Sequence, residues 1–108
     1  MITEKPWGSE FLWAITENYA AKVININKNS RLSLQKHLEK EETIFVLSGV
    51  LYLTIEKDEI KLKPGSHYHI SPNIVHRFSA KDEPVSLMEV STTQLNDVVR
   101  IEDDYNRV

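Results

Sequence analysis

Short runs in which apolar and polar residues alternate recur along most of the chain. Alternation with a period of two is typical of β-strands that bury one face. Clusters of Asn, Ser, Asp, Gly and Pro separate these runs, and such clusters mark turns. The runs that we predict as strands cover residues 11–15, 21–26, 31–37, 43–47, 50–56, 59–62, 67–70, 76–80 and 85–91.

Helical periodicity is nearly absent, and only residues 93–100 have a pattern that fits a helical turn. Many short strands separated by turn signals favour an all-β fold, in which the strands form an antiparallel sandwich or barrel. In this fold we expect five apolar side chains from two neighbouring strands to lie in the core. They are Phe45, Leu47, Leu51, Leu53 and Ile55.

Length and composition limit the classes of protein to which the chain can belong. Its 108 residues are enough for a single domain, which we expect to cover residues 1–108. The net charge is -3 and no basic patch stands out, so we expect no nucleic-acid partner. No apolar run is long enough to span a membrane, and we see no secretory signal. The absence of cysteine excludes disulfides and thiolate ligands and fits the cytoplasm, where we expect the protein to act.

Four side chains in two separate parts of the sequence offer nitrogen and oxygen ligands. Gln35 and His37 are two residues apart, so on one strand they project from the same face. Glu42 lies five residues beyond His37, across an expected bend, and His76 sits near the start of a later strand. If the sheet closes into a barrel, these four side chains can converge on one metal ion.

The chemistry of this ligand set indicates which metal to expect. Nitrogen and oxygen donors without sulfur suit zinc, manganese, iron, cobalt and nickel. Two imidazoles favour zinc or iron over calcium or magnesium. We therefore predict a divalent cation, with zinc as the first choice. The alternative is that these are ordinary surface side chains, because a lone His37 or Glu42 is more often solvated than bound to a metal.

The same residues resemble the two motifs of the cupin family. The first family motif has two histidines around a variable residue, followed at fixed distances by a glutamate and a glycine. Gln35, His37, Glu42 and Gly49 match it, with glutamine in the first place. The second motif leads from a corner rich in Pro and Gly to a histidine, here His76. The resemblance implies a jelly-roll barrel, or double-stranded β-helix, with these four ligands in its interior.

Three longer stretches resemble one group of cupins, the isomerase domain of type II phosphomannose isomerases. They are residues 5–9, 31–37 and 99–107. This resemblance implies the interconversion of mannose 6-phosphate and fructose 6-phosphate on a bound metal. Such domains are usually fused to mannose-1-phosphate guanylyltransferases. The nucleotidyltransferase half is absent from this sequence, so we expect no sugar-nucleotide synthesis.

The implied isomerisation moves a proton between two carbons of the sugar, so it needs a base. The candidates are hydroxide held by the metal and the side chains of His69, His67 and Glu89. His67 and His69 alternate along one strand and share a face, which can point inward or outward. We take His69 as the expected catalytic base.

The phosphate of such a substrate needs cations close to the metal. Arg100 and Arg107 match arginines in the closing motif of the family, and we expect Arg100 to act in catalysis and Arg107 to bind substrate. Lys22 and Arg31 lie on strands near the ligands and are further candidates for binding substrate. Arginine suits this role because it contacts phosphate through two donors at once. The alternative is that these four residues are surface charges.

Departures from the isomerase motif leave two other functions open. Leu38 and Glu39 follow His37, where that group of isomerases has two further histidines. A cupin that binds a metal and a small sugar or acid without turnover is therefore the second interpretation. An iron-dependent cupin oxygenase is the third, although Gln35 in place of a histidine counts against it.

The edges of the predicted sheets lead us to expect a homodimer. A strand at the edge of a sheet has unpaired backbone groups, and pairing across subunits is one way to satisfy them. We expect the segment 5–11, which carries Trp7 and Phe11, to cross between the two subunits.

Overall fold

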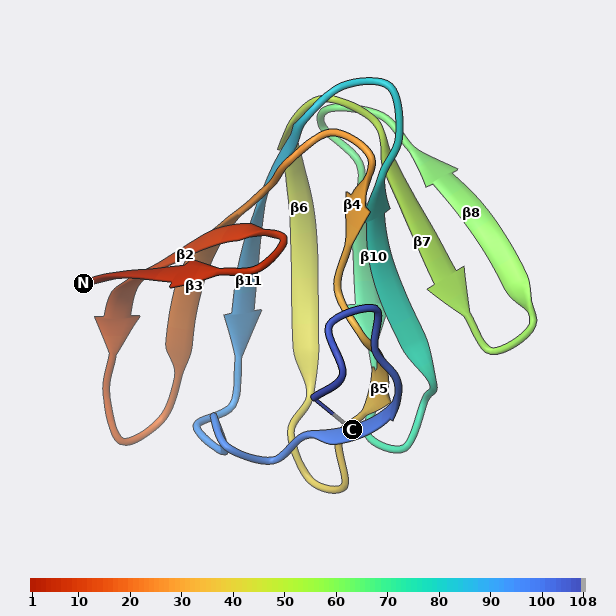
Figure 1. The fold of residues 1–108 in the computed structure, drawn as a ribbon. Helices are drawn as coiled ribbons and strands as arrows, with labels where there is room; N and C mark the ends of the chain where they lie inside the picture. Colours follow the sequence, from red (N-terminus) through yellow and green to blue (C-terminus); the bar gives the residue numbers. More distant parts are fainter. Residues whose placement is uncertain (108) are drawn as a thin grey trace.

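Two antiparallel sheets lie face to face in the computed structural model, which describes residues 1–107 (Figure 1). The first sheet has the strand order β1-β2-β3-β11-β6-β9. Its strands are β1 (Ile2–Lys5), β2 (Gly8–Ile15), β3 (Ala20–Ile26), β6 (Glu42–Ser48), β9 (His67–Ile70) and β11 (Val85–Ser91). The second sheet has the order β12-β5-β10-β7-β8, and β4 also pairs with β10. Its strands are β4 (Ser30–Arg31), β5 (Leu34–Lys36), β7 (Leu51–Ile55), β8 (Asp58–Leu62), β10 (His76–Ala80) and β12 (Val99–Glu102).

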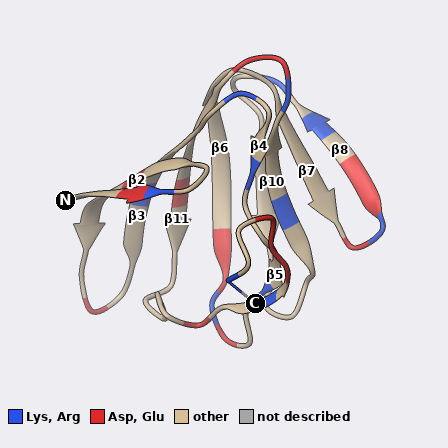
Figure 2. Ribbon diagram, viewed as in Figure 1, with Lys and Arg blue, Asp and Glu red and all other residues tan. Residues whose placement is uncertain are grey.

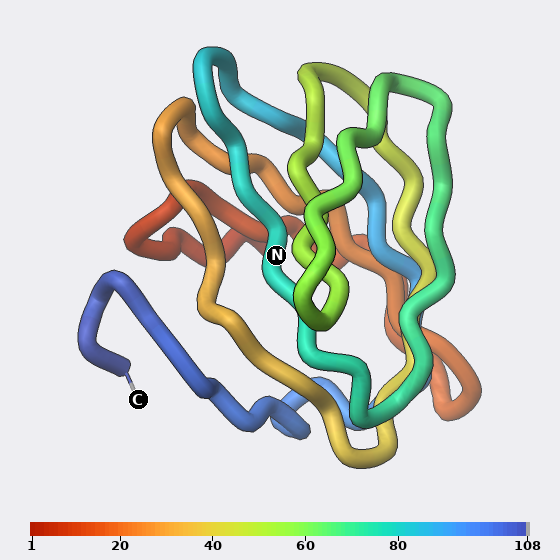
Figure 3. Tube along the Cα trace, turned by 90° about the vertical axis from the view of Figure 1, so that its right-hand side faces the viewer, coloured from red at the N-terminus to blue at the C-terminus, as the bar shows by residue number. Residues whose placement is uncertain are grey.

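Strands that are distant in sequence are neighbours in both sheets. β11 lies between β3 and β6, and β10 lies between β5 and β7. This interleaving of the two ends of the chain is the topology of a jelly roll. The prediction of an all-β fold is confirmed, since residues 1–107 contain no helix and therefore none that could cross a membrane. Figure 3 shows the C-terminal segment, in dark blue, running beside β5 at the edge of the second sheet.

The core fills the space between the two sheets with aliphatic side chains, the indole of Trp7 and the phenyl ring of Phe78. Its most deeply buried apolar residues include Ile24, Ile26, Ile44, Val46, Leu51, Leu53, Ile70, Val85 and Leu87. The prediction is confirmed for Leu51 and Leu53, which are fully buried, and Ile55 packs against the core while partly exposed. Trp7 is also buried in this cluster.

The prediction is wrong for Phe45 and Leu47, which lie on the outside of the first sheet with about two-fifths of their surface exposed. Residues 43–47 are apolar apart from one threonine, so the sequence does not say which face of this strand points inward. In the structure the inward positions of β6 belong to Ile44 and Val46, which are fully buried.

Two strands, β1 and β12, were not predicted from the sequence, and one predicted strand is divided in two. β1 and β12 lie at the ends of their sheets and lack the alternation that marks a strand with one buried face. The predicted strand 31–37 is broken into β4 and β5, with Leu32 and Ser33 between them. The segment 93–100 forms successive tight turns rather than a helix, and then enters β12.

Gly49 joins β6 to β7 where the chain passes very close to another segment. Its φ is +74°, and an added Cβ would meet the backbone oxygen of Pro84 at 2.2 Å. Gly65 also has a positive φ, of +89°, but a Cβ there would have open space around it. An added Cβ would therefore cause backbone strain at both glycines, but a steric clash only at Gly49.

We expect Gly49→Ala to destabilise the fold more than Gly65→Ala. Each substitution forces an L-residue to a positive φ, which costs about 1–2 kcal/mol. Only Gly49→Ala adds a collision with backbone atoms. It should therefore lower the free energy of unfolding by at least about 1 kcal/mol more than Gly65→Ala, which serves as the control. Urea unfolding of both variants and the unchanged chain measures the difference. Equal losses would show that the close approach to Pro84 does not constrain this turn.

Candidate metal centre and its cavity

Three of the four predicted ligands meet at one end of the two sheets. His37 follows β5, Glu42 begins β6 and His76 begins β10. All three side chains are buried, with 1–3% of their surface exposed. One ligand atom from each lies within 4.8 Å of the ligand atoms of the other two, the spacing of a group that can hold one metal ion.

The backbone fixes the orientation of both imidazoles. His37 Nδ1 is 2.6 Å from the carbonyl oxygen of Asp97, and His76 Nδ1 is 2.9 Å from that of Ile74. Because a carbonyl can only accept a hydrogen bond, each Nδ1 carries the proton and each Nε2 presents a lone pair. This is the arrangement in which metal-binding histidines are usually held.

The two lone pairs point toward the carboxylate of Glu42. Its Oε1 is 3.3 Å from His37 Nε2 and 3.1 Å from His76 Nε2. Both Nε2 atoms and both Glu42 oxygens are buried without a hydrogen-bond partner among residues 1–107. A cation placed between these acceptor atoms would satisfy all of them together, so the residues fit a divalent metal.

Gln35, the fourth predicted ligand, lies beside this group. It is directly opposite His76 in the pairing of β5 with β10, so the two side chains share a face. The hydroxyl of Ser33 donates a hydrogen bond of 2.6 Å to Gln35 Oε1 and orients the amide. Gln35 and His37 also line the same cavity.

Asp97 holds the loop that follows His37. Its carboxylate accepts hydrogen bonds from the backbone N–H groups of Leu38, Glu39 and Lys40, at 2.7–3.0 Å. These bonds lower the pKa of Asp97 to about 2. Sequence reasoning missed this residue, because it lies 60 residues from His37 in a segment without regular structure. The only available signal was an acidic residue among turn-forming residues, which is common in any protein.

Asn73 supports the same end of the site from the other side. Its backbone N–H donates a 2.7 Å hydrogen bond to the carbonyl oxygen of His37. Its φ is +67°, the left-handed conformation that asparagine tolerates better than most residues. The turn before His76 therefore stabilises both histidines.

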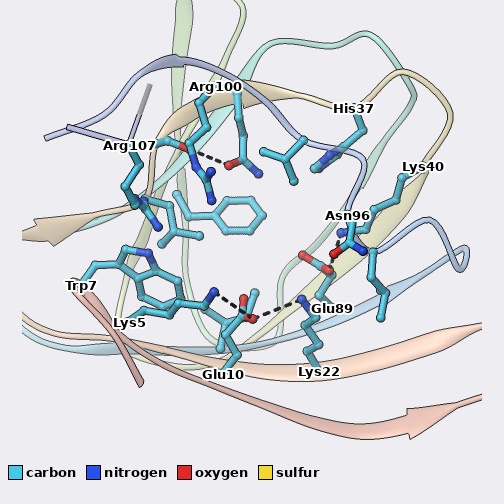
Figure 4. Close-up of a pocket in the computed structure, with 17 residues that line it drawn as sticks. Lys5, Trp7, Glu10, Lys22, His37, Lys40, Glu89, Asn96, Arg100 and Arg107 are labelled. Carbon is cyan, nitrogen blue, oxygen red and sulfur yellow. Dashed lines mark hydrogen bonds and ion pairs between the residues drawn. The ribbon is translucent and has the colours of Figure 1, made fainter. Parts of the chain in front are cut away.

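His37, Glu42 and His76 together form what we call the metal group. A cavity of about 370 Å³ opens beside it (Figure 4). Figure 4 shows His37, Lys40 and Glu89 at one end of the cavity and Lys5 and Arg107 at the opposite end, beside Trp7. The complete lining consists of Lys5, Trp7, Glu10, Lys22, Ile24, Leu32, Ser33, Gln35, His37, Lys40, Phe78, Glu89, Leu95, Asn96, Val98, Arg100 and Arg107. Five of these residues are cations and two are acidic, so the cavity suits an anionic ligand of small size.

Most cations of the cavity are already paired. Lys22 Nζ lies 3.2 Å from Glu10, and Lys40 Nζ lies 3.1 Å from Glu89. Arg100 differs, because its Nε is buried and has no hydrogen-bond partner among residues 1–107. Among the described residues that line the cavity, Arg100 is therefore a cation whose Nε–H group is buried and still free to donate a hydrogen bond.

Lys40 and two carboxyl groups form a buried ionic cluster next to the metal group. Burial lowers the pKa of Lys40, but the charges of Glu89 and Glu42 outweigh this effect and raise it overall. Burial and the neighbouring charge of Glu42 raise the pKa of Glu89 well above its ordinary value. Burial would also raise the pKa of Glu42, but the close approach of Glu89, His37 and His76 and the positive charge of Lys40 hold this pKa well below the ordinary value. The two carboxyl groups therefore differ strongly in acidity.

Some of the residues predicted to bind or convert the substrate line the cavity, and others lie away from it. Lys22, Arg100 and Arg107 line it. Arg31 does not, since both ends of its guanidinium bind the Asp104 carboxylate at 2.8 and 2.9 Å on the surface. His69 lies outside the cavity as well, because the inward positions of β9 are taken by the alternate residues.

His69 is half exposed, and its Nε2 is 2.6 Å from the carboxylate of Glu41 on the outer face of the first sheet. His67 is on the same outer face and is exposed. Neither histidine can therefore reach a substrate held beside the metal group. Of the base candidates from the sequence, Glu89 is the side chain that lines the cavity.

The C-terminal segment is clamped in place. Arg31, Arg77 and Arg107 each form an ion pair with one acidic residue of 102–104. Arg107 donates through Nε and Nη2 to both oxygens of Asp103, at 2.7 and 3.0 Å. This hydrogen-bonded pair lowers the pKa of Asp103 to about 2. The clamp positions the cavity wall that carries Arg107.

A jelly-roll fold with a buried His–Glu metal group at one end defines a protein of the cupin class. The sequence model described as "Mannose-6-phosphate isomerase C-terminal" matches residues 2–103. The chain therefore belongs to this family, and the resemblance seen in the sequence is confirmed.

Curated relatives of the chain include two bacterial proteins. The xanthan biosynthesis protein XanB of Xanthomonas campestris is 28% identical over 107 residues, which cover 95% of this chain and 23% of XanB. The mannose-1-phosphate guanylyltransferase ManC of Salmonella typhimurium is 31% identical over 108 residues, which cover 96% of this chain and 22% of ManC. The chain thus spans less than a quarter of the length of these relatives.

Solved structures show the same fold. KdgF from Halomonas sp. superposes with a TM-score of 0.81 at 14% identity, covering 90% of this chain and 91% of that chain. A putative sugar phosphate isomerase from Acidithiobacillus ferrooxidans has a TM-score of 0.65 at 23% identity, covering 70% of this chain and 51% of the other. Cupins from Shewanella frigidimarina are also similar, one with a TM-score of 0.80 at 14% identity over 89% of this chain and 86% of that chain.

We expect the chain to bind one divalent zinc ion and His37→Ala to weaken this binding by about two orders of magnitude or more. Binding should also raise the melting temperature, because the ion binds only the folded state. Isothermal titration with zinc and thermal melting with and without zinc provide the measurements. His69→Ala is the matched control and should bind zinc as the unchanged chain does.

Gln35→Ala provides a second test if His37→Ala does not fold. It removes an amide ligand without exposing a buried charge, and we expect at least tenfold weaker zinc binding. Equal zinc affinity in the Gln35, His37 and His69 variants would contradict the assignment of the metal group.

We expect Asp103→Asn to lower the free energy of unfolding at pH 7 but not at pH 2 or below. The folded pKa of Asp103 lies below the ordinary value of 3.8, so its carboxylate stabilises the fold above that value. This contribution is lost as the pH falls through the folded pKa of about 2. Urea unfolding of both proteins across this range tests the expectation. A difference that persists unchanged at pH 2 would show that the ion pair is not its cause.

Proposed function

We propose that this domain is a metal-dependent sugar-phosphate isomerase that interconverts mannose 6-phosphate and fructose 6-phosphate. The observation that carries the proposal is that a group of metal ligands and an arginine with an unused, buried donor share one small cavity. Family membership supports the substrate class, although the chain spans less than a quarter of the length of its curated relatives.

The metal would be held by Gln35, His37, Glu42 and His76. Zinc is the ion that this donor set favours, and the protein itself would be cytoplasmic. A bound divalent cation would act as a Lewis acid that polarises the sugar carbonyl and stabilises negative charge on its oxygen. Ser33 and Asp97 keep the ligands in place for this role, through the Gln35 amide and the loop after His37.

Arg100 would bind the phosphate of the substrate. In the pairing of β12 with β5 it is directly opposite Gln35, so the two side chains share a face. Its Nε donor is already out of water and unpaired, so a phosphate oxygen that accepts its hydrogen bond satisfies a group that is otherwise costly to bury. Lys22 and Arg107 would add positive charge without giving up their own ion pairs.

Glu89 would move the proton between C1 and C2 of the sugar, in place of His69. Its carboxyl is buried and faces the cavity from β11, close to His37 and Glu42. Lys40 binds one of its oxygens at 3.1 Å and thereby fixes the orientation of the carboxyl group. Trp7, Leu32 and Phe78 line the cavity with apolar surface and limit the access of water to the reacting carbons.

A second candidate function is binding of a metal and a small anion without turnover. The paired state of Lys22, Lys40 and Arg107 favours it, since these cations already have partners before any substrate arrives. The oxygenase has no such support. The two remaining candidates make different predictions, because only the isomerase converts its ligand.

We expect the chain loaded with zinc to convert mannose 6-phosphate to fructose 6-phosphate and to stop when a chelator is added. Arg100→Gln should raise KM by about 10- to 100-fold with metal binding unchanged, because it removes a charge-assisted contact with phosphate. Arg31→Gln, outside the cavity, is the matched control and should keep the KM of the unchanged chain.

Glu89→Gln should lower kcat by about 100-fold or more with little change in KM. A coupled assay that follows fructose 6-phosphate measures all three variants. A chain that binds zinc and mannose 6-phosphate but never converts it would replace the isomerase with the binding function. A chain that binds neither would overturn both.

A further inference from the structure

The inner face of the first sheet carries a row of charges that alternate in sign. The strands β2, β3 and β11 contain one charged residue each, and these are Glu10, Lys22 and Glu89. All three line the cavity, and Lys22 is directly opposite Glu89 in the pairing of β3 with β11. Figure 2 shows these strands as tan ribbons interrupted by single coloured positions. Lys5, the last residue of β1, also lines the cavity and lies at one end of this row.

Lys5 is neutralised less than the other members of the row. Glu10 Oε1 is 3.2 Å from Lys22 Nζ but 4.0 Å from Lys5 Nζ, so Lys22 donates a hydrogen bond to this oxygen and Lys5 does not. In the described part of the chain, Glu10 is the one acidic residue that forms an ion pair with Lys5. The Lys5 side chain keeps 29% of its surface exposed. Its ammonium group therefore has donors left for a ligand.

The turn after Lys5 holds this part of the chain beside the cavity. Lys5 is paired with Gly8 at the end of the β1–β2 hairpin. Pro6 and Trp7 form the turn between them. Trp7 is buried in the core, and its carbonyl oxygen accepts a 2.9 Å hydrogen bond from the backbone N–H of Asn27. The backbone next to such an anchor moves little, so only the flexible side chain of Lys5 has to adjust to a ligand.

Arg100 enters the same cavity from the opposite wall. It is on β12 of the second sheet, whereas Lys5 is on β1 of the first sheet. Figure 4 shows both side chains pointing into the cavity, with Trp7 and Arg107 at the edge between them. Arg100 Nε is buried and has no hydrogen-bond partner among the residues that the structure describes. A group that lies between the two walls can therefore accept hydrogen bonds from both cations.

The charges of the cavity wall leave these two cations unbalanced. Each of the other three lysines and arginines in the wall has a carboxylate oxygen within 3.2 Å, and the pairs are Lys22 with Glu10, Lys40 with Glu89 and Arg107 with Asp103. Lys5 and Arg100 remain, so a ligand meets two positive charges that lack a close partner. A phosphate monoester carries a charge of about −1.5 to −2 at pH 7. A sulfate ester or a carboxylate carries a single negative charge.

We propose that Lys5 and Arg100 hold the phosphate of the substrate between them, and that this pair of cations selects esters with two negative charges. This role of Lys5 rests on the proposed function, in that a phosphate ester occupies the cavity. A dianion balances both cations and accepts charge-assisted hydrogen bonds from each of them. A monoanion of the same size leaves one cation unbalanced. Lys5 is thus a residue that determines specificity.

The order of groups along the cavity fits a phosphate that is remote from the reacting carbons. Figure 4 shows His37 at one end of the cavity and Lys5 at the opposite end, beside Trp7. A sugar whose phosphate lies at Lys5 extends its other end toward the metal group. A phosphate on the last carbon of the sugar therefore leaves the first two carbons at the metal group.

Calorimetric titration of the zinc-loaded chain with mannose 6-phosphate and with mannose 6-sulfate tests this selection. The two esters have the same sugar and nearly the same size, and they differ in charge. We expect the unchanged chain to bind the phosphate ester at least about tenfold more tightly. Lys5→Gln should lower the affinity for the phosphate ester by about tenfold or more and the affinity for the sulfate ester by about threefold or less.

Two further variants show whether the effect belongs to the charge at this position. Lys61→Gln is the matched control, because it removes the same charge from an exposed position on β8, outside the cavity, and should leave both affinities unchanged. Lys5→Arg keeps the charge and should keep the preference for the phosphate ester. Circular dichroism and zinc titration of each variant separate a loss of phosphate binding from a loss of the fold or of the metal.

Binding and conversion are measured separately, so the role of Lys5 and the isomerase can fail separately. Equal affinity of the unchanged chain for the two esters would overturn the role of Lys5. So would a Lys5→Gln variant that keeps the preference for phosphate, whether or not the chain is an isomerase. A chain that binds the phosphate ester without converting it would overturn the isomerase alone, and the ratio of the two affinities would still decide the role of Lys5. A chain that binds neither ester would overturn both.

Discussion

The constraint on which this structure depends is the convergence of acceptor atoms from His37, Glu42 and His76 at one buried point. Each acceptor that is removed from water without a partner costs about 1–3 kcal/mol, so the folded chain alone would carry several such penalties. The backbone makes the arrangement obligatory, because the carbonyl groups of Asp97 and Ile74 fix both histidines with their lone pairs inward. A single cation satisfies all of these atoms together. The end of the sheets is thus arranged so that it could hold one metal ion.

The sequence was sufficient to predict the class of fold and the convergence of His37, Glu42 and His76. Alternation identified most strands, and the spacing of Gln35 and His37 placed both on one face. The sequence pattern could not show which face of a strand is buried where both faces carry similar residues. Phe45 and Leu47 lie in a run with apolar residues at both faces, so either face could be buried. His67 and His69 alternate with Tyr68 and Ile70, and only the packing shows that the histidines point outward.

Contacts between segments that are distant in the sequence could not be predicted either. Asp97 supports the loop after His37 from a segment without secondary structure. Arg31 and Arg77 hold the acidic tail by ion pairs from other strands, and nothing in the sequence indicates these pairs. An arginine such as Arg31 has the right charge for binding phosphate, and only its bidentate pairing with Asp104 shows that this charge is already used.

The cavity on the inner face of the first sheet and the apolar side chains on its outer face require opposite kinds of residue from the same strands, and both requirements favour one register. In β11 Glu89 points into the cavity, while its neighbours Met88 and Val90 point outward. A shift of pairing by one residue would turn Glu89 to the apolar outer face and Met88 toward the ionic cluster. The same shift in β6 would remove Glu42 from the two histidines. A sheet with charged side chains toward its interior can therefore tolerate no shift in strand pairing.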